Sequence, residues 1–348
     1  MTSQHTVRLG IVGLRNIGMK HLKGALPLDG VSITALADTD DQRLAEARKL
    51  APDAQTFTDA SELLASDAAD AVVLAVPNHL HAPMTVEALD AGKHVLVEKP
   101  MAMNTGEARR MIDARDRSGQ TLLVGMNQRF APLHAAARRA VSECVLGEVT
   151  HGLTCWVTNR PFAGLWERGD WFLSGKTSGG GPLIDLGIHR LDLAMYLLDF
   201  PAVESVTGFC TDGIGRRIAS ERGLSYELED YAQGLIRFDS GMALTLEAGY
   251  FQNVPAHRQE TILSGADASL VLEVGNDDDT GIWAYEGDQV VHRMLEPDTS
   301  GPASPVEHFC RVLRGEDEPG PTAEQGLAGL TIVEAIYESA RTGRAVTF

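Results

Sequence analysis

The sequence predicts an α/β domain with a doubly wound parallel sheet over residues 1–127, then an α+β domain with a large, mostly antiparallel sheet over residues 128–348. In the first part, short apolar runs alternate with segments of helical length, as in parallel sheets covered by helices. After residue 147, strand-like runs follow one another with turns between them, as in antiparallel sheets. The closing helices could pack back on the first domain.

Composition and charge exclude several classes of protein. The chain is 44% hydrophobic and 22% charged, which is typical of a globular protein. Its formal net charge of −18 argues against binding to nucleic acids or to anionic membrane surfaces, both of which favour basic patches. We find no apolar run of transmembrane length and no signal peptide. The four cysteines form no CxxC motif, so we expect reduced thiols and a cytoplasmic protein.

The first predicted strand, helix and strand carry a candidate dinucleotide-binding motif. Residues 7–12 form an apolar run, a glycine-containing turn and a helical stretch follow, and a second apolar run over residues 31–37 ends at Asp38. Backbone N–H groups at such a helix N-terminus bind a pyrophosphate, and the acid binds the ribose 2′-hydroxyl. Because this acid repels a 2′-phosphate, NAD is favoured over NADP. The turn residues expected to bind the cofactor are Gly13, Arg15, Asn16, Ile17 and Gly18.

Arg15 departs from the usual glycine pattern of this motif. The middle glycine normally allows the backbone to approach the pyrophosphate. The arginine could crowd the cofactor, turn outward, or place its guanidinium on a phosphate or on the adenine.

The same alternation continues to residue 124. Further strands are expected at residues 71–76, 94–97 and 121–124, and helices at residues 40–50, 61–65, 82–91 and 105–118. Ligands of doubly wound sheets bind outside the carboxyl ends of the strands. Several polar residues stand directly after strand ends there, namely Asn78, His81, Glu98 and Lys99.

Lys99 is the sharpest of these candidates, because it stands between an acid and a proline that restricts its backbone. It could donate a hydrogen bond to a substrate oxygen, or it could be a solvated loop lysine. His79 and His81 have no third ligand at a suitable spacing, so we expect no metal site.

A glycine-rich segment at residues 179–181 precedes Pro182 and an apolar run that ends at residue 198. The pattern predicts a helix over residues 179–198, on which Asp185 and His189 lie one turn apart on the same face. A carboxylate beside an imidazole suits proton transfer, because it fixes the tautomer and raises the proton affinity. The alternative is a surface ion pair on an ordinary helix.

The remaining elements belong to the second predicted domain. A loop rich in Trp and Gly over residues 159–178 follows a strand at residues 149–157, and Trp side chains there could stack on a ligand or close a core. Helices are expected at residues 131–145, 305–314 and 322–342, and strands at residues 203–211, 230–238, 242–250, 260–265, 269–274, 281–286 and 290–295.

Five segments together resemble the family of glucose–fructose oxidoreductase, inositol dehydrogenase and MocA (Gfo/Idh/MocA). The resemblance covers almost the whole chain and implies a Rossmann domain followed by an open-faced, mostly antiparallel sheet that forms homodimers or homotetramers. The segments are the N-terminal fingerprint with Asp38, Pro77-Asn78-His79-Leu80-His81, Glu98-Lys99-Pro100, Asn127-Gln128-Arg129-Phe130 and the glycine-rich segment that ends at His189.

The resemblance implies a catalytic group of Lys99, Asp185 and His189. His189 would exchange a proton with the substrate hydroxyl, and Asp185 would orient His189 or bind a neighbouring hydroxyl. Lys99 would bond to the reacting oxygen and would also contact the cofactor. The cofactor ribose would contact Pro77, Asn78, His81 and Glu98, and the substrate would also contact Arg129, Trp166 and Tyr231.

The activity implied is NAD-dependent oxidation of a secondary hydroxyl of a sugar, inositol or related polyol to a ketone, with His189 as general base. Two alternatives remain: an NAD-dependent glycoside hydrolase with transient oxidation, and a non-catalytic NAD-binding protein.

Overall fold

The computed structural model describes residues 6–159, 170–273 and 279–348. The chain divides into two compact units. Unit 1 consists of Met1–Asn127 with Pro302–Leu327, and unit 2 of Gln128–Gly301 with Ala328–Phe348. Unit 1 therefore includes a segment that follows the sheet of unit 2 along the chain.

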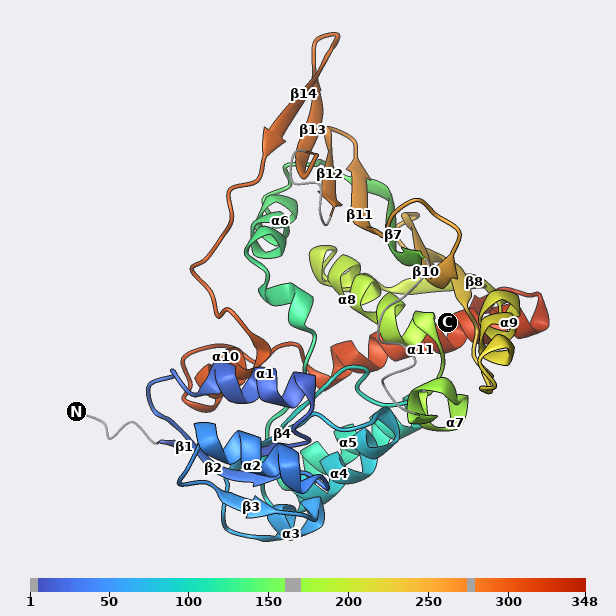
Figure 1. The fold of residues 1–348 in the computed structure, drawn as a ribbon. Coiled ribbons are helices and arrows are strands. Elements are labelled where there is room, and N and C mark those ends of the chain that lie inside the picture. The colour runs from blue at the N-terminus through green and yellow to red at the C-terminus, as the bar shows by residue number, and fades with distance from the viewer. Residues whose placement is uncertain (1–5, 160–169, 274–278) are drawn as a thin grey trace. The chain divides into compact units, whose positions relative to one another are not determined.

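Unit 1 contains a six-stranded parallel sheet in the order β3-β2-β1-β4-β5-β6 (Figure 1). Its order reverses between β1 and β4, as in a doubly wound sheet, which confirms the predicted fold class. Strand β3 was not predicted, because it is short and mostly exposed and so has no apolar run. The strands are β1 Val7–Val12, β2 Val31–Ala37, β3 Gln55–Phe57, β4 Ala71–Leu74, β5 His94–Val97 and β6 Leu122–Val124.

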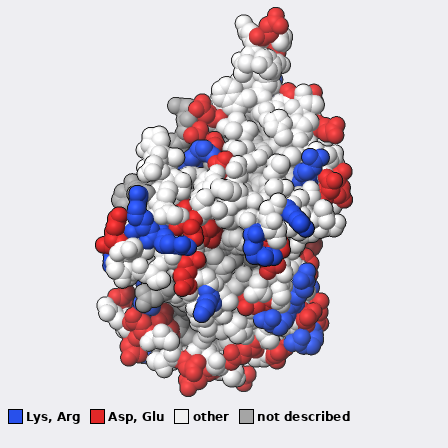
Figure 2. All heavy atoms as spheres, turned by 90° about the vertical axis from the view of Figure 1, so that its right-hand side faces the viewer, with Lys and Arg blue, Asp and Glu red and all other residues white. Residues whose placement is uncertain are grey.

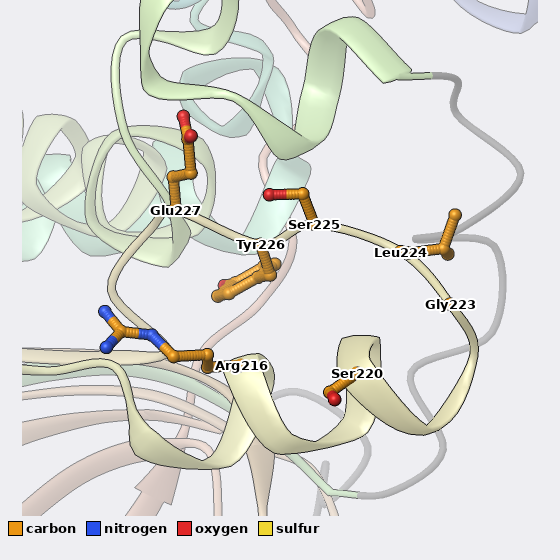
Figure 3. A pocket seen from close by; sticks show the side chains of 7 residues that line it. All are labelled: Arg216, Ser220, Gly223, Leu224, Ser225, Tyr226 and Glu227. Atoms are coloured by element: carbon orange, nitrogen blue, oxygen red, sulfur yellow. The ribbon is translucent and has the colours of Figure 1, made fainter.

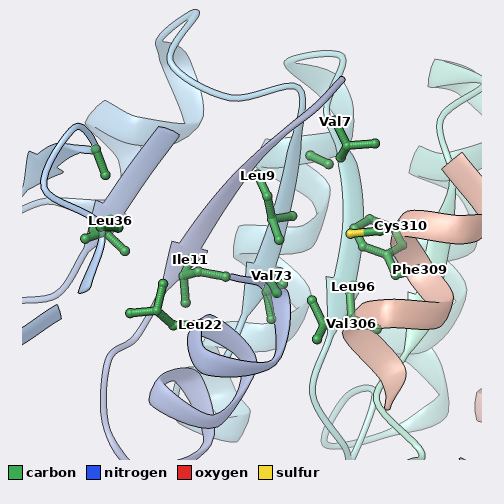
Figure 4. Close-up of a cluster of buried hydrophobic side chains, with 14 of the residues drawn as sticks. Val7, Leu9, Ile11, Leu22, Leu36, Val73, Leu96, Val306, Phe309 and Cys310 are labelled. Carbon is green, nitrogen blue, oxygen red and sulfur yellow. The ribbon is translucent and has the colours of Figure 1, made fainter. Parts of the chain in front are cut away.

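The helices of unit 1 form two groups. Helix α1 packs against α2 and α10, and α4 packs against α3 and α5. Apolar residues of β1, α1 and α10 share one buried cluster, shown in Figure 4. The helices are α1 Asn16–Ala25, α2 Asp41–Leu50, α3 Ala60–Ala65, α4 Asn78–Asp90, α5 Thr105–Ser118 and α10 Pro305–Leu313.

Unit 2 contains a nine-stranded sheet in the order β14-β13-β12-β11-β7-β10-β9-β8-β15. Only its β7–β10 pair is parallel, so the predicted antiparallel character is confirmed. The two-residue strand β15 was not predicted. The strands are β7 Val149–Asn159, β8 Val203–Thr211, β9 Tyr231–Phe238, β10 Ala243–Gln252, β11 Arg258–Gly265, β12 Ala268–Glu273, β13 Gly281–Glu286, β14 Gln289–Met294 and β15 Val346–Thr347.

The predicted helix over residues 179–198 differs from the observed structure. A π-helical turn, η3, covers Leu183–Gly187, and only then does the α-helix α8 run over Ile188–Leu197. The turn packs on β7 and β10, and α8 packs on β7 and α6. The other helices are η1 Asn127–Phe130, α6 Pro132–Ser142, η2 Asp170–Leu173, α7 Gly175–Ser178, α9 Gly213–Glu221 and α11 Ala323–Thr342, which spans the boundary between the units.

Charged side chains of both signs are mixed on the face shown in Figure 2. The described residues include exposed ion pairs such as Arg8–Asp70 and Arg117–Asp90. Within residues 6–159, 170–273 and 279–348, no helix is both long and apolar enough to cross a membrane.

Candidate active site

The turn between β1 and α1 requires both of its glycines. Gly13 has φ of +85°, and a Cβ atom there would overlap the carbonyl oxygen of Ala75. A Cβ atom at Gly18 would overlap the carbonyl oxygen of Gly13. These close approaches bring the N-terminus of α1 against the ends of β1 and β4, which is the location of a pyrophosphate site.

The N-terminus of α1 suits an anionic ligand. The side chain of its N-cap residue, Arg15, makes no capping hydrogen bond, whereas the N-cap side chains of α2, α3 and α5 do. Arg15 at the N-cap is exposed and extended, with φ of −73° and ψ of −167°, so it meets the backbone requirement of the turn without strain. Asn16 and Ile17 are exposed beside it. These residues therefore fit a dinucleotide, whose phosphates would meet the backbone N–H groups at the N-terminus of α1.

Asp38 lies at the end of β2, and its side chain is largely buried. One carboxylate oxygen accepts a hydrogen bond from the Leu14 N–H at 2.6 Å, and the other accepts one from the Asp40 N–H at 2.9 Å. Arg43 lies 3.4 Å from the same carboxylate. The acid thus joins the glycine turn to β2 and places its carboxylate beside α1.

Helix α4 begins at Asn78, one turn earlier than predicted, with Pro77 as its N-cap. His81 is buried, and its two ring nitrogens lie 2.7 Å from the Pro100 carbonyl oxygen and 2.9 Å from that of Val76. Burial lowers the pKa of His81, which favours the neutral ring. A neutral ring carries a single N–H, so His81 donates a hydrogen bond to one of these two carbonyl oxygens.

Glu98 and Lys99 follow β5 and are both half-buried. The Glu98 carboxylate lies 2.7 Å from Nε2 of buried His21 and accepts a hydrogen bond from the Lys99 backbone N–H at 3.2 Å. Burial by itself would raise the pKa of Glu98, but the hydrogen bond and charge of His21 and the charge of Lys99 lower it below its usual range. An ionised carboxylate therefore fixes the backbone from which the candidate lysine projects.

In unit 2, Asp185 lies in the π-helical turn η3 and His189 lies in the first turn of α8. Both are buried. The Tyr250 hydroxyl, from β10, donates a hydrogen bond of 2.6 Å to Asp185 Oδ2. The ring of Trp156, from β7, lies with its centroid 5.6 Å from that of His189. The sheet thus supplies an aromatic partner for each of the two residues. Single-turn π-helices occur often at functional sites.

The structure uses Arg129 for packing. Its guanidinium makes two hydrogen bonds to buried Asp192, of 2.8 and 2.6 Å, and lies 5.1 Å from the ring centroids of Tyr196 and Phe200. Arg129 is thus held in a buried ion pair, and its contact with the substrate stays a prediction. Trp166 lies outside the described residues.

Tyr231 projects from the opposite face of the sheet to the one that faces η3. It pairs with Gly249, whereas its neighbour Ala232 pairs with Ala248. A Cβ atom at Gly187 of η3 would lie 3.1 Å from the Ala248 Cβ, so Ala248 faces that turn. Successive strand residues alternate between faces, so Tyr231 is separated from Asp185 and His189 and is not retained in the substrate site.

Two further features lie outside these residues. A surface hollow of about 510 Å³, shown in Figure 3, is lined by Arg216 and Ser220 of α9 and by residues 223–227, and contains no predicted site residue. No group of three or more His, Cys, Asp or Glu residues suited to a metal ion occurs in the part of the chain that the structure describes.

Two family models match the chain in succession. Residues 7–126 match the oxidoreductase family with an NAD-binding Rossmann fold, and residues 138–348 match the C-terminal α/β domain of the same family, Gfo/Idh/MocA. The chain belongs to this family. The match confirms the predicted resemblance, the oxidoreductase class and the NAD-binding domain.

Other Gfo/Idh/MocA proteins are similar over nearly their whole length. The chain is 32% identical to the D-glucoside 3-dehydrogenase of Escherichia coli K12, over 99% of this chain and 98% of that protein. It is 24% identical to the myo-inositol 2-dehydrogenase of Thermotoga maritima, over 98% of each. The WlbA dehydrogenase of Bordetella pertussis, solved with NADH and UDP-GlcNAcA, has the same fold, with a TM-score of 0.82, 23% identity, and coverage of 100% of this chain and 99% of that one.

Proposed function

We propose that this Gfo/Idh/MocA protein is an NAD-dependent dehydrogenase that oxidises a secondary hydroxyl of a sugar, inositol or related polyol to a ketone. The observation that carries the proposal is the buried Asp185–His189 segment with its Tyr250 and Trp156 partners, in a chain of an oxidoreductase family. The names of the D-glucoside and inositol dehydrogenases support the substrate class.

In the proposed reaction, NAD supplies the acceptor for the hydride when it is bound. His189 accepts the proton of the substrate hydroxyl, because a neutral imidazole is a suitable base near neutral pH. Asp185 orients the substrate or His189, and its own position is fixed by the Tyr250 hydroxyl. Lys99 takes part in the same reaction by donating a hydrogen bond to the reacting oxygen. Asn78 and Glu98 contact the ribose of the bound cofactor.

The first test is NADH absorbance with purified protein, NAD and a panel of aldoses, glycosides, inositols and anhydrosugars, with NADP in parallel. A rise with one compound supports the dehydrogenase and names its substrate. A flat panel with NAD retained after purification overturns it in favour of the glycoside hydrolase. A flat panel with no retained nucleotide overturns it in favour of a non-catalytic protein.

Replacement of Tyr250 by Phe should lower kcat about tenfold, because it removes one hydrogen bond to a buried carboxylate while preserving the ring. Steady-state kinetics with the substrate from the panel measure the effect. Tyr285→Phe is the control, since Tyr285 is an exposed tyrosine on β13. Equal kcat values for Tyr250→Phe and wild type would contradict the role of Tyr250.

Replacement of Asp38 by Ala should raise the Kd for NAD about tenfold and narrow the preference over NADP. The variant loses the acid that we propose for the ribose and the two backbone hydrogen bonds that shape the turn. Fluorescence titration with NADH and NADPH measures both affinities. Asp59→Ala, which removes a helix cap at α3, is the control for simple destabilisation. An unchanged cofactor preference would place Asp38 away from the ribose.

We also propose that the protein forms a homodimer or homotetramer through the open face of the unit 2 sheet. Phe209 and Leu235 are 56% and 45% exposed. Leu235 pairs with Thr207, two residues from Phe209, so the two apolar side chains share one face. Large apolar residues gathered on one exposed face favour association. Sedimentation equilibrium of Leu235→Lys against wild type tests this assembly.

A further inference from the structure

The chain segment that carries the candidate acid and base is held at its beginning by a carboxylate from another part of unit 2. Glu229 stands two residues before β9. One of its oxygens accepts a hydrogen bond from the Gly181 N–H at 2.8 Å, and the other accepts one from the Leu183 N–H at 3.1 Å. The Tyr337 hydroxyl, from α11, donates to that second oxygen at 2.8 Å. We call Glu229 and Tyr337 the helix clamp.

The glycines at this point fit the clamp closely. A Cβ atom at Gly181 would overlap the Glu229 carbonyl oxygen, and one at Gly180 would overlap the Tyr337 hydroxyl. Gly180 also has φ of +156°, which side chains rarely adopt. The two glycines therefore allow the backbone to approach Glu229 and Tyr337 closely. A run of glycines often indicates a flexible segment, but here the lack of side chains serves this close contact.

The clamp satisfies donors that a helix leaves unpaired. The first N–H groups of a helix have no partner within it, and a carboxylate placed there also interacts favourably with the positive end of the helix dipole. The N-cap of η3, Pro182, provides no side-chain cap. Glu229 supplies the missing acceptor from 46 residues further along the chain.

Asp185 lies two residues after the second clamped N–H group, and His189 four residues after Asp185. The Asp185 N–H bonds to the Gly181 carbonyl at 3.1 Å, so Gly181 is linked to the clamp on one side and to Asp185 on the other. A shift of the clamp would therefore move the acid and base together.

We infer that Glu229 and Tyr337 are positioning residues for Asp185 and His189, an inference that rests on the proposed dehydrogenase function. Neither residue belongs to the reacting group itself. They set the place of η3 and the start of α8, and thereby the alignment of the proton acceptor. Misplacement of a catalytic group by about 1 Å can cost about 10²-fold in rate.

Two variants test the clamp. Glu229→Gln retains one acceptor atom but turns an NH₂ group toward a backbone N–H, and Tyr337→Phe removes only the hydroxyl. Tyr285→Phe is the control, because Tyr285 is 75% exposed on β13 and belongs to neither the clamp nor the candidate site. The readouts are kcat and KM with the substrate from the panel, the Kd for NADH, and amide hydrogen exchange over residues 181–190.

We expect kcat of Glu229→Gln to fall about 10²-fold, and that of Tyr337→Phe by less, with the Kd for NADH within twofold of wild type. Exchange over residues 181–190 should be faster in both variants and unchanged in Tyr285→Phe. Unchanged exchange in Glu229→Gln would overturn the clamp. Faster exchange with unchanged kcat would show a merely structural role and overturn the inference.

Failure of the proposed function gives a different result. A wild-type protein that is inactive across the panel refutes the dehydrogenase and with it the positioning role. In that case, hydrogen exchange over residues 181–190 still shows whether Glu229 stabilises this part of the chain.

Discussion

Replacement of His189 by Ala is expected to reduce kcat by about 10²–10⁴-fold, because the variant lacks the proton acceptor of the proposed reaction. Binding of NADH should be unchanged, since the glycine turn that fits the dinucleotide is in unit 1 and His189 is in unit 2. Steady-state kinetics and titration with NADH measure the two quantities separately.

His151→Ala provides the matched control for this variant, because His151 is an exposed histidine on β7 of the same unit. It should retain wild-type turnover. Normal turnover in His189→Ala would show that another group accepts the proton. Loss of NADH binding together with turnover would point to general unfolding, which circular dichroism of the variant would reveal.

Replacement of Asp192 by Ala is expected to lower the free energy of unfolding by about 3–5 kcal/mol, the largest stability effect that we predict. The variant removes the carboxylate from a buried ion pair with Arg129, and breaking a buried pair on one side is strongly destabilising. Urea denaturation followed by circular dichroism measures the difference from wild type.

The double variant Arg129→Met with Asp192→Leu separates the effect of the ion pair on stability from the effect of side-chain packing. It removes both charges and keeps apolar volume against Tyr196 and Phe200, so its stability should be closer to wild type than that of Asp192→Ala. If the double variant is as unstable as the single one, the loss comes from packing and the ion pair is not the cause.

Most of the fold could be predicted because the buried strands are continuous apolar runs and the helices have apolar residues at helical spacing. The strand Ala71–Leu74 is buried at every position, so its sequence alone identifies it. Strands β3 and β15 have two or three residues and no such run, and they form because a neighbouring strand offers hydrogen bonds. Helix α9 was missed although its sequence is amphipathic, since Ile214 and Ile218 are four residues apart and pack with Ala219 into a buried cluster.

Within the candidate site, spacing identified the residues that are near in sequence. Asp185 and His189 are four residues apart, so a helix was predicted to place both side chains on one face. The π-helical turn that contains Asp185 has no sequence period of its own. It is stabilised by contacts with β7 and β10, which a linear pattern does not contain.

Partners that are far apart in sequence were missed. Tyr250 is 65 residues from Asp185, and Tyr337 is 108 residues from Glu229. The adjacent acids Glu229 and Asp230, directly before a strand, were a signal that could have pointed to the clamp. Two acids at the start of a strand need hydrogen-bond partners when they are buried. Conversely, Arg129 was assigned to substrate because the sequence does not show that Asp192 already occupies its guanidinium.

The return of residues 302–327 to unit 1 has a consequence for how this chain can be divided and recombined. Val306, Phe309 and Cys310 of α10 fill the same core as Leu9 and Ile11 of the first strand (Figure 4). A cofactor module cut after residue 127 would leave that apolar surface open to solvent. Exchange of cofactor modules between relatives therefore has to transfer two separate pieces of the chain, the N-terminal segment and the returning segment that carries α10.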